Sequence, residues 1–302
     1  MKITKVITLF AYADAFTWLG VRNQESFTCG STALGRVQKR LCARHEKFAP
    51  AIKAAASESI KLCKETMSGE RWGCAGVHKL PYLARGLKKS TAEAAFLHGL
   101  SSGQLIASLY RLCQSGTIGH CEKNEVEQFA QQFTNVASMI KDKKSVQDIE
   151  LHNSKVGRAL AWGSKNKICK CHGQSGSCSM KTCWETAPRA DVISKKALEK
   201  YSKSVKVQLD NDDIAIPTEL KRTIARNRFL YLEEADDFCK TTSGRICQMS
   251  ESSTSSHCDS LCCGRGEVKR EKMVVENECI FVWPDQIKCT PKAKKETSYV
   301  CK

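Results

Sequence analysis

Eighteen cysteines among 302 residues constrain this chain more than any other feature of its sequence. The count is even, so in an oxidising compartment it predicts nine disulfides, whereas in the cytosol it would indicate metal sites. Hydrophobic residues make up 41% of the chain, which is enough for a packed core and too much for a disordered protein. The compartment therefore decides how the cysteines are used.

The N-terminal residues 1–15 predict export from the cell. Lys2 and Lys5 precede an apolar run from Val6 to Ala13, and small-residue cleavage patterns follow. This order is typical of a secretory signal peptide, and the alternative is a cytosolic N-terminal helix. No later apolar run approaches the ~20 residues of a membrane helix. We expect a secreted protein without a transmembrane segment, although the sequence contains no N-glycosylation sequon.

The chain carries a formal net charge of +16. Such an excess favours contact with a polyanion, and in a secreted, cysteine-rich protein sulfated glycans or acidic receptor surfaces fit better than nucleic acid. A solvated charged face is the alternative explanation. The basic residues that we expect to contact heparan sulfate are Lys195, Lys196, Lys221, Arg222, Arg226 and Arg228.

Hydrophobic periodicity predicts a helical first half of the chain. We expect helices over residues 37–67, with a break at Pro50, and over 91–112, 126–140 and 145–162.

Beyond Trp162 the pattern changes. A short amphipathic helix is expected over 195–207 and a charged linker over 210–228. From Phe229 onward, short β-prone pieces such as FLYL and CIFVW alternate with cysteines. A domain of that size usually depends on disulfides rather than on a large core. The predicted divisions are a signal peptide at 1–15, a helical N-terminal domain at 16–190, a basic linker at 191–235 and a cysteine-rich domain at 236–302.

Residues 169–184, CKCHGQSGSCSMKTCW, allow three hypotheses. A zinc site would use the cysteines and His172, but the C-x-C-H spacing fits structural zinc sites poorly. A serine nucleophile would use Ser175, but GQSGS departs from the G-x-S-x-G elbow and no triad partner is evident.

The third hypothesis is a hairpin closed by nested disulfides, with Cys171 bonded to Cys178 inside and Cys169 bonded to Cys183 outside. The glycines of this stretch permit a tight turn. The inner bridge would stabilise the hairpin by roughly 2–3 kcal/mol. Its tip would display Ser175, although a purely structural staple is the alternative.

This stretch resembles the signature of the Wnt family of secreted signalling proteins, C-K-C-H-G-x-S-G-S-C followed by K-T-C-W. Arg71-Trp-Gly-Cys74 resembles the family's R-W-N-C, and Leu151-His-Asn153 with Gly157-Arg158 resembles L-H-N-N-x-A-G-R. Further matches are Glu233 to Cys239, Gly244-Arg245-x-Cys247, Leu261 to Gly266 and Cys301-Lys302.

The resemblance implies an α+β fold. A helical N-terminal domain would carry a disulfide-braced hairpin (the thumb, residues 169–183), and a small cysteine-rich β-hairpin domain would form an index finger. It also implies a non-enzymatic developmental ligand, secreted to the extracellular space or matrix, with neither catalytic residues nor a resident metal or cofactor.

The implied partners are the cysteine-rich domain of Frizzled receptors and an LRP-type co-receptor. The implied receptor-binding residues are Gln174, Ser175 and Gly176 on the thumb and Phe281, Val282 and Trp283 on the index finger. Ser175 corresponds to the family serine that the acyltransferase Porcupine modifies with palmitoleate.

The chain departs from the family in its cysteines, of which the family has about two dozen. The gaps fall at Lys123, near residues 131–138, and at Asn277, Pro284, Asp285 and Lys292, and they remove three complete bridges of the family. The pairing of the family then implies nine disulfides among the cysteines that remain: Cys29–Cys42, Cys63–Cys74, Cys113–Cys121, Cys169–Cys183, Cys171–Cys178, Cys239–Cys263, Cys247–Cys258, Cys262–Cys301 and Cys279–Cys289.

These departures place the chain among divergent, cysteine-poor members such as the insect WntD-like branch. Gln174 stands where an apolar residue is usual, and Pro284-Asp285 replaces a cysteine pair at the index-finger tip. An unacylated, soluble ligand or antagonist of the same fold is therefore the main alternative. A disulfide-rich hydrolase and an intracellular zinc protein are the alternatives of other classes.

Overall fold

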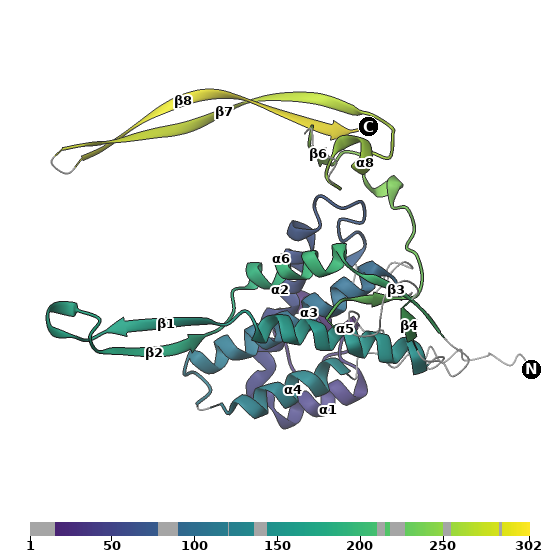
Figure 1. The fold of residues 1–302 in the computed structure, drawn as a ribbon, viewed down its shortest axis with the longest axis vertical. Helices are drawn as coiled ribbons and strands as arrows, with labels where there is room; N and C mark the ends of the chain where they lie inside the picture. Colours follow the sequence, from purple (N-terminus) through teal and green to yellow (C-terminus); the bar gives the residue numbers. More distant parts are fainter. Residues whose placement is uncertain are drawn as a thin grey trace, which may run out of the picture. The chain divides into compact units, whose positions relative to one another are not determined.

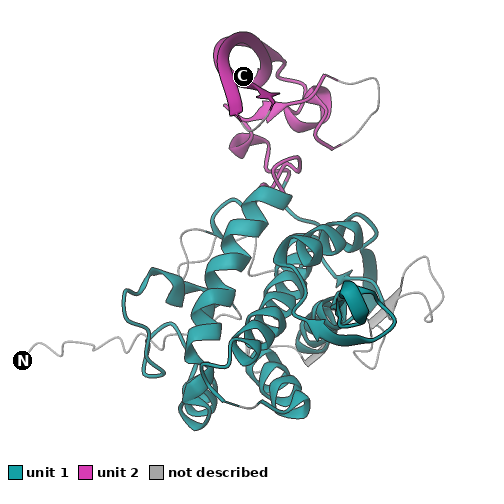
Figure 2. Cartoon of the chain, turned by 90° about the vertical axis from the view of Figure 1, so that its left-hand side faces the viewer, with its two compact units in different colours: residues 1–66, 74–236 teal, residues 67–73, 237–302 magenta. Residues whose placement is uncertain are grey.

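The computed structural model describes residues 16–77, 90–119, 121–135, 144–209, 215–217, 227–249, 255–283 and 286–302. The expected signal peptide therefore lies outside the described residues. The chain divides into two compact units, which Figure 2 colours separately. Unit 1 comprises residues 1–66 and 74–236, and unit 2 comprises 67–73 and 237–302. Residues 67–73 thus belong with the C-terminal unit, whereas the sequence-based division placed them in the N-terminal domain.

Unit 1 is a helical bundle that carries a β-hairpin (Figure 1). Its central helix is α3, whose residues from Glu93 to Leu109 are all buried. Ala, Gly and Ser occupy much of this helix, and α2, α4, α5 and α6 all pack against it. The helical elements are η1 (Thr17–Asn23), α1 (Arg36–Arg44), η2 (Glu46–Phe48), α2 (Ala49–Thr66), α3 (Ala92–Gln114), α4 (Lys123–Asn135), α5 (Lys144–Trp162) and α6 (Ala190–Ser202).

The close approach of α3 and α5 depends on glycines. A Cβ atom at Gly157 would lie 1.9 Å from the carbonyl oxygen of Gly99, and one at Gly103 would lie 2.9 Å from the carbonyl oxygen of Gly157. No side chain fits at those distances, so the two helices touch through their backbones. The Gly157-Arg158 match to the family pattern therefore marks a helix crossing.

The predicted break at Pro50 coincides with the junction between η2 and α2. Pro50 is the second residue of α2, where a helix does not need the missing backbone N–H. The helix expected over 195–207 instead spans Ala190–Ser202, and strand β3 (Val205–Leu209) follows it. The first part of the expected linker 191–235 is thus folded, because Ile193, Ala197 and Val205 are buried.

A small mixed sheet in unit 1 has the order β4-β3-β5. Strand β3 pairs antiparallel with β4 (Ala215–Pro217) and parallel with β5 (Leu230–Tyr231). Ile149 of α5 packs with Val205, Val207 and Leu230 in one cluster, which attaches the sheet to the helices. The predicted strand at FLYL is confirmed, although it is only two residues long.

Disulfide bonds are the main interactions that stabilise unit 2. It contains η7 (Cys239–Thr241), β6 (Ile246–Cys247), α8 (Cys258–Leu261) and the long strands β7 (Glu267–Val282) and β8 (Gln286–Cys301). Its buried cluster consists of Leu261 and four disulfide-bonded cysteines: Cys247, Cys258, Cys262 and Cys301. So small a core fits the expectation that this domain depends on its disulfides.

Strands β7 and β8 pair antiparallel in a long ribbon, which we call the index finger (Figure 1). At its base the short strand β6 pairs antiparallel with β8, so the sheet has the order β6-β8-β7. Strands β7 and β8 each have sixteen residues, far longer than the short pieces expected from sequence. The Cys279–Cys289 disulfide joins directly opposed residues. From Glu267 to Tyr299 almost every residue is exposed or half-buried, so burial contributes little to its stability.

All eighteen cysteines form disulfides, and the nine pairs are those that the family pairing implied. The pairs of unit 1 are Cys29–Cys42, Cys63–Cys74, Cys113–Cys121, Cys169–Cys183 and Cys171–Cys178. The pairs of unit 2 are Cys239–Cys263, Cys247–Cys258, Cys262–Cys301 and Cys279–Cys289. Each disulfide therefore lies within one unit, and none joins the two.

The described part of the chain contains no helix that is both long enough and apolar enough to span a bilayer.

Candidate functional site

The thumb hairpin projects from the helices of unit 1 (Figure 1). It is formed by β1 (Asn166–Cys171) and β2 (Lys181–Thr186), which pair antiparallel with Cys169 opposite Cys183. The Cys169–Cys183 disulfide bridges the strands and the Cys171–Cys178 disulfide closes the loop. Two covalent links within so short a hairpin keep the turn rigid although nothing buries it.

The tip of the thumb is a tight turn over Gln174, Ser175, Gly176 and Ser177. The amide of Ser177 donates to the carbonyl of Gln174 at 3.1 Å. Ser175 and Gly176 both have positive φ, 55° and 77°, as the two central residues of a type I′ hairpin turn do. For serine this left-handed conformation costs about 1–2 kcal/mol relative to the right-handed one. The fold therefore holds Ser175 in an unfavourable backbone geometry.

Gly173 lets the turn fold back on itself. A Cβ atom at this position would lie 2.2 Å from the hydroxyl oxygen of Ser177 and 2.3 Å from that of Ser179. The amide of Gly173 donates to the carbonyl of Ser177 at 2.8 Å, and the amide of His172 donates to that of Met180 at 2.7 Å. The glycine in C-H-G thus permits the close packing that turns Ser175 outward.

The Ser175 side chain is exposed. In the part of the chain that the structure describes, no side chain forms a hydrogen bond with its hydroxyl. The hydrolase hypothesis requires a base beside this hydroxyl, and no such base is in place. The zinc hypothesis requires thiolates, whereas the cysteines at 169, 171, 178 and 183 are oxidised. The arrangement instead offers an accessible hydroxyl to another enzyme or to a partner.

The thumb also carries exposed apolar side chains that the sequence analysis did not select. Ile168 and Trp184 are opposed across the strands, with 48% and 46% of their surfaces exposed, and Met180 near the turn is 67% exposed. The K-T-C-W match contains Trp184, so its position in the motif was the available signal. An exposed tryptophan on a rigid ribbon is a typical interface residue.

The index-finger tip presents a second apolar group. Phe281 is 65% exposed and Trp283 is 84% exposed, whereas Val282 is half-buried. Ile287 lies opposite Phe281 and is 69% exposed, and the sequence analysis missed it. These side chains are therefore displayed to solvent rather than packed inside unit 2. Pro284 and Asp285 lie outside the described residues.

The strand register continues this apolar group along one face of the index finger. Side chains alternate between faces, so Met273, Val275 and Cys279 share the face of Phe281. Met273 and Val275 are 61% and 64% exposed. The opposite face carries ion pairs such as Lys292–Glu278 at 3.2 Å and Lys294–Glu276 at 3.7 Å. The apolar side chains of this face lie in its distal half, whereas Lys269, Glu271 and Lys295 form ion pairs on the same face farther from the tip. On the opposite face, Ile280 is 61% exposed.

The family assignment follows from comparison with known proteins. The Wnt family profile matches residues 31–128 and 124–302, which together span most of the chain. The chain belongs to the Wnt family.

Curated Wnt proteins from vertebrates match over nearly the full length. Wnt-11b-2 of Xenopus tropicalis is 29% identical over 302 residues, covering 88% of this chain and 85% of the relative. Wnt-16 of Bos taurus is 26% identical over 337 residues, covering 94% and 91%. Wnt proteins are secreted developmental signalling ligands rather than enzymes. As a member of this family, the chain is a Wnt-type signalling ligand.

A solved structure of human WLS in complex with WNT8A contains a chain with the same fold. The TM-score is 0.61 at 24% identity, covering 96% of this chain and all of the other. The expected α+β fold, a helical domain followed by a disulfide-rich β-hairpin domain, is therefore confirmed. The N-terminal domain and linker of Drosophila WntD also align, over 64% of this chain, with a TM-score of 0.48 at 16% identity.

The Wnt motif around α5 proves to be structural. The amide group of Asn153 pairs with the backbone of Leu230, and a ring nitrogen of His152 lies 2.9 Å from the carbonyl oxygen of Arg228. Arg158 donates to Thr134 Oγ1 at 2.6 Å, and burial lowers the pKa of its guanidinium to about 10. These contacts attach α5 to α4 and to the segment that contains β5.

The basic residues expected to bind glycans have mixed environments. Lys195 is exposed, Lys196 donates to the hydroxyl of Ser164 at 2.8 Å, and Arg228 lies near Lys200 and Lys203. The pKa of Lys200 is lowered, first by partial burial and then by the nearby positive charges of Arg228 and Lys203. Lys200 and Lys203 were not among the basic residues selected from the sequence. Lys221, Arg222 and Arg226 lie outside the described residues.

Proposed function

We propose that this Wnt protein binds the cysteine-rich domain of a Frizzled-type receptor through the tips of its thumb and index finger. The thumb would contribute Gln174, Ser175 and Gly176. An LRP-type co-receptor would complete the signalling complex. The observation that carries the proposal is the exposed Ser175 hydroxyl at a turn fixed by two disulfides.

Acylation of Ser175 would supply most of the thumb's apolar contact. The turn itself contains only glycine, glutamine and serine, which bury little apolar surface. A palmitoleoyl chain transferred to the hydroxyl by a Porcupine-type acyltransferase would bring a gross gain of roughly 10 kcal/mol, at about 0.8 kcal/mol per buried CH₂. Ordering and association costs reduce that gain. The lipid would still exceed any single side-chain contact.

The index finger would contribute Phe281, Val282 and Trp283. Large aromatic side chains on a rigid scaffold are the usual centres of binding energy. The exposure of Trp283 and Phe281 supports this role, since neither ring is needed to hold unit 2 together. Ile287, opposite Phe281, would widen the same contact.

An unacylated ligand or antagonist, as expected of a WntD-like branch, is the second candidate. Gln174 precedes the acceptor serine and is exposed, and a polar residue there makes the thumb tip polar throughout. Such a protein would rely on the index finger and would diffuse more freely. Contact with heparan sulfate through Lys195, Lys200, Lys203 and Arg228 would then hold it near cell surfaces or matrix.

Binding to purified Frizzled-type cysteine-rich domains tests both candidates. If the thumb is acylated, Ser175→Ala should weaken binding by at least about a hundredfold. Trp283→Ala should weaken binding by about tenfold or more. Val268→Ala is the matched control, because it removes an exposed apolar side chain far from the tip.

The outcomes separate the candidates. The unacylated ligand is favoured if the wild-type protein binds tightly, Ser175→Ala binds equally tightly and Trp283→Ala does not bind. No binding to any Frizzled-type domain, by a wild-type protein that is folded and acylated, would contradict the receptor proposal.

A further inference from the structure

Strand β7 of the index finger has one edge without a neighbouring strand. Its sheet has the order β6-β8-β7, so within the described residues β7 pairs on one side only. Every second residue of β7 therefore directs its backbone N–H and C=O away from β8. The open edge runs from Glu267 to Val282. Such an edge is a template on which another strand can pair.

The charges on one face of β7 are symmetric about Val274. Arg270 and Lys272 precede Val274 by four and two residues, and Glu276 and Glu278 follow it by two and four. These residues share a face because side chains alternate along a strand. Antiparallel pairing of two copies about Val274 would place Lys272 opposite Glu276 of the second copy. It would also place Arg270 opposite Glu278, and symmetry repeats both contacts.

Other registers of two β7 strands are less favourable. A shift of one residue sets Glu271 opposite Glu276 or Glu278 of the second copy, and like charges in direct opposition are destabilising. A shift of two residues keeps only half of the opposite-charge contacts. In-register parallel pairing sets every charge opposite its own copy. Edge charges usually prevent pairing, but here they select one antiparallel register.

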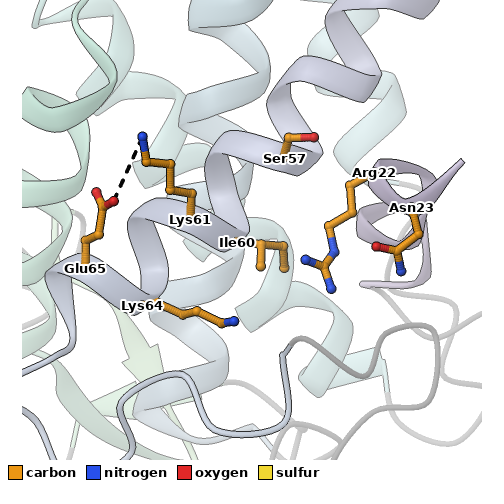
Figure 3. A pocket seen from close by; sticks show the side chains of 7 residues that line it. All are labelled: Arg22, Asn23, Ser57, Ile60, Lys61, Lys64 and Glu65. Atoms are coloured by element: carbon orange, nitrogen blue, oxygen red, sulfur yellow. Dashed lines mark ion pairs between the residues drawn. The ribbon is translucent and has the colours of Figure 1, made fainter. Parts of the chain in front are cut away.

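The two cations of this edge have no partner in the single chain. Exposed charges elsewhere pair locally, as Lys61 does with Glu65 on α2 at 4.0 Å (Figure 3). Within the residues that the structure describes, Arg270 and Lys272 form neither a hydrogen bond nor an ion pair. Their charges are therefore available to a second strand.

The carboxylates of this edge would bridge two strands in the paired arrangement. Glu276 pairs with Lys294 of β8 at 3.7 Å, and Glu278 pairs with Lys292 at 3.2 Å. Glu276 would then lie between Lys294 of its own chain and Lys272 of the second copy. Positive and negative side chains would thus alternate across four strands, which stabilises a sheet surface.

The same register covers exposed apolar side chains. Met273 of one copy would lie opposite Val275 of the other, and these side chains are 61% and 64% exposed in the single chain. Val268 would lie opposite Ile280, with exposures of 46% and 61%. Val274 would lie opposite its own copy. Their removal from water adds a favourable contribution to the charge contacts.

The outer edge of β8 is poorly suited to the same pairing. Pro291 lies within β8 and has no N–H to offer to another strand. The charges of β8 are mostly of one sign, so two β8 edges would repel each other: Lys288, Lys292, Lys294 and Lys295 against Glu296. Pairing through β7 alone uses the same surface on both copies, so it closes a two-fold dimer and does not extend into a filament.

We propose that two copies of this protein associate by antiparallel pairing of their β7 strands, centred on Val274. The product is one sheet of the order β8-β7-β7-β8, in which the tip of each index finger lies beside the base of the other finger. The contact uses the sides of the fingers. It depends neither on acylation of Ser175 nor on receptor binding.

Sedimentation equilibrium of the full-length secreted protein tests the dimer. All variants carry Ser175→Ala, so that no acyl chain can drive association. Lys272→Glu should raise the dimer dissociation constant about tenfold or more, because two attractive contacts with Glu276 become repulsive. Lys288→Glu changes net charge equally on β8 and should raise it less than about twofold.

Charge complementation separates the proposed register from a general effect of charge. Glu276→Lys should weaken association as Lys272→Glu does, because a lysine at 276 faces Lys272 of the second copy. An equimolar mixture of the two variants should restore the dissociation constant of the unmodified edge, since each variant supplies the charge that the other lacks. Peptide mapping of the Cys279–Cys289 disulfide confirms that the finger of each variant is intact.

An introduced cysteine reads the register directly. Opposed residues of antiparallel strands have Cα atoms about 4.5–5.5 Å apart, which suits a disulfide. Val274→Cys should therefore be recovered as a disulfide-linked dimer. Val268→Cys should not, because Val268 lies opposite Ile280 and far from its own copy. A protein that stays monomeric up to about 100 μM, a mixture that associates as weakly as its components, or equal cross-linking at 274 and 268 would overturn the proposal.

Discussion

The side chain of Asn153 substitutes for a β-strand partner of Leu230. Asn153 Nδ2 donates to the carbonyl oxygen of Leu230 at 2.9 Å, and the amide of Leu230 donates to Asn153 Oδ1 at 2.8 Å. Both residues are buried. A single asparagine thus joins α5 to the small sheet and satisfies two backbone groups that no water reaches.

Asn153→Ala should therefore destabilise unit 1 by about 2–4 kcal/mol, because it leaves a buried N–H and a buried C=O unpaired. The urea midpoint of unfolding measures the loss. Lys155→Ala, on the exposed side of the same helix, should change the midpoint little. An Asn153→Ala variant as stable as the control would show that these hydrogen bonds contribute nothing net.

Gly157→Ala should be among the most damaging single changes in the chain. The added methyl would overlap the Gly99 carbonyl oxygen, and both backbones are buried. We expect a loss of at least about 3 kcal/mol, or failure of secretion. Gly163→Ala is the matched control, because its Cβ would meet only the Ala159 carbonyl oxygen at 3.4 Å. Comparable secretion and thermal stability for the two variants would be evidence against the close helix crossing.

Arg245→Lys tests how residues 67–73 are attached to unit 2. The Arg245 guanidinium donates to the carbonyls of Ser68, Glu70 and Arg71 at 2.6–2.7 Å. Partial burial lowers the pKa of Arg245. Lysine cannot reach three carbonyls with a planar fork, so amide hydrogen exchange in residues 67–73 should accelerate about tenfold or more. Arg270→Lys on the exposed index finger should leave that exchange unchanged, and equal exchange in both variants would contradict the attachment.

The index finger should show a defined pH response at Glu271. Hydrogen bonds from Lys295 and Lys269 hold the pKa of this carboxyl below its usual value. A depressed carboxyl pKa stabilises the folded finger above the unfolded pKa, and that contribution is lost as the pH falls through the folded pKa. Lys295→Gln should raise the Glu271 pKa toward its usual value, measured by NMR titration of the side-chain carboxyl.

Lys294→Gln provides the control for this titration, since Lys294 pairs with Glu276 instead. The Glu271 pKa should stay depressed in that variant. If Lys295→Gln left it equally depressed, the Lys295 hydrogen bond would not be its cause.

Features set by local pattern could be predicted from the sequence. The long helices followed from apolar spacing, and Pro50 indicated the junction before α2. The thumb followed from nested cysteines around Gly173, whereas pairs such as Cys29–Cys42 and Cys239–Cys263 came from the family resemblance rather than from spacing. The left-handed conformation of Ser175 had no sequence signal, since serine seldom adopts it.

Other features depend on contacts distant in sequence. Residues 67–73 join unit 2 through Arg245, and hydrogen bonds to backbone carbonyls leave no trace in side-chain patterns. The sequence analysis expected only short β-prone pieces such as CIFVW in this region. The two long strands are rich in Lys and Glu, so no regular apolar alternation marks their full length. Ion pairs such as Lys292–Glu278 and one disulfide support this exposed ribbon in place of a buried face. The sequence could not show whether Trp283 packs inside unit 2 or projects into solvent, because that depends on where this ribbon carries it.

The intact mass of the protein secreted by cells that express Porcupine tests the central claim most directly. The account predicts a mature chain lighter by eighteen hydrogens than its fully reduced form, two for each of nine disulfides. It also predicts one added palmitoleoyl group that is absent from Ser175→Ala. A wild-type chain with nine disulfides and no acyl group, or an acyl group that persists in Ser175→Ala, would contradict the role given to the Ser175 hydroxyl.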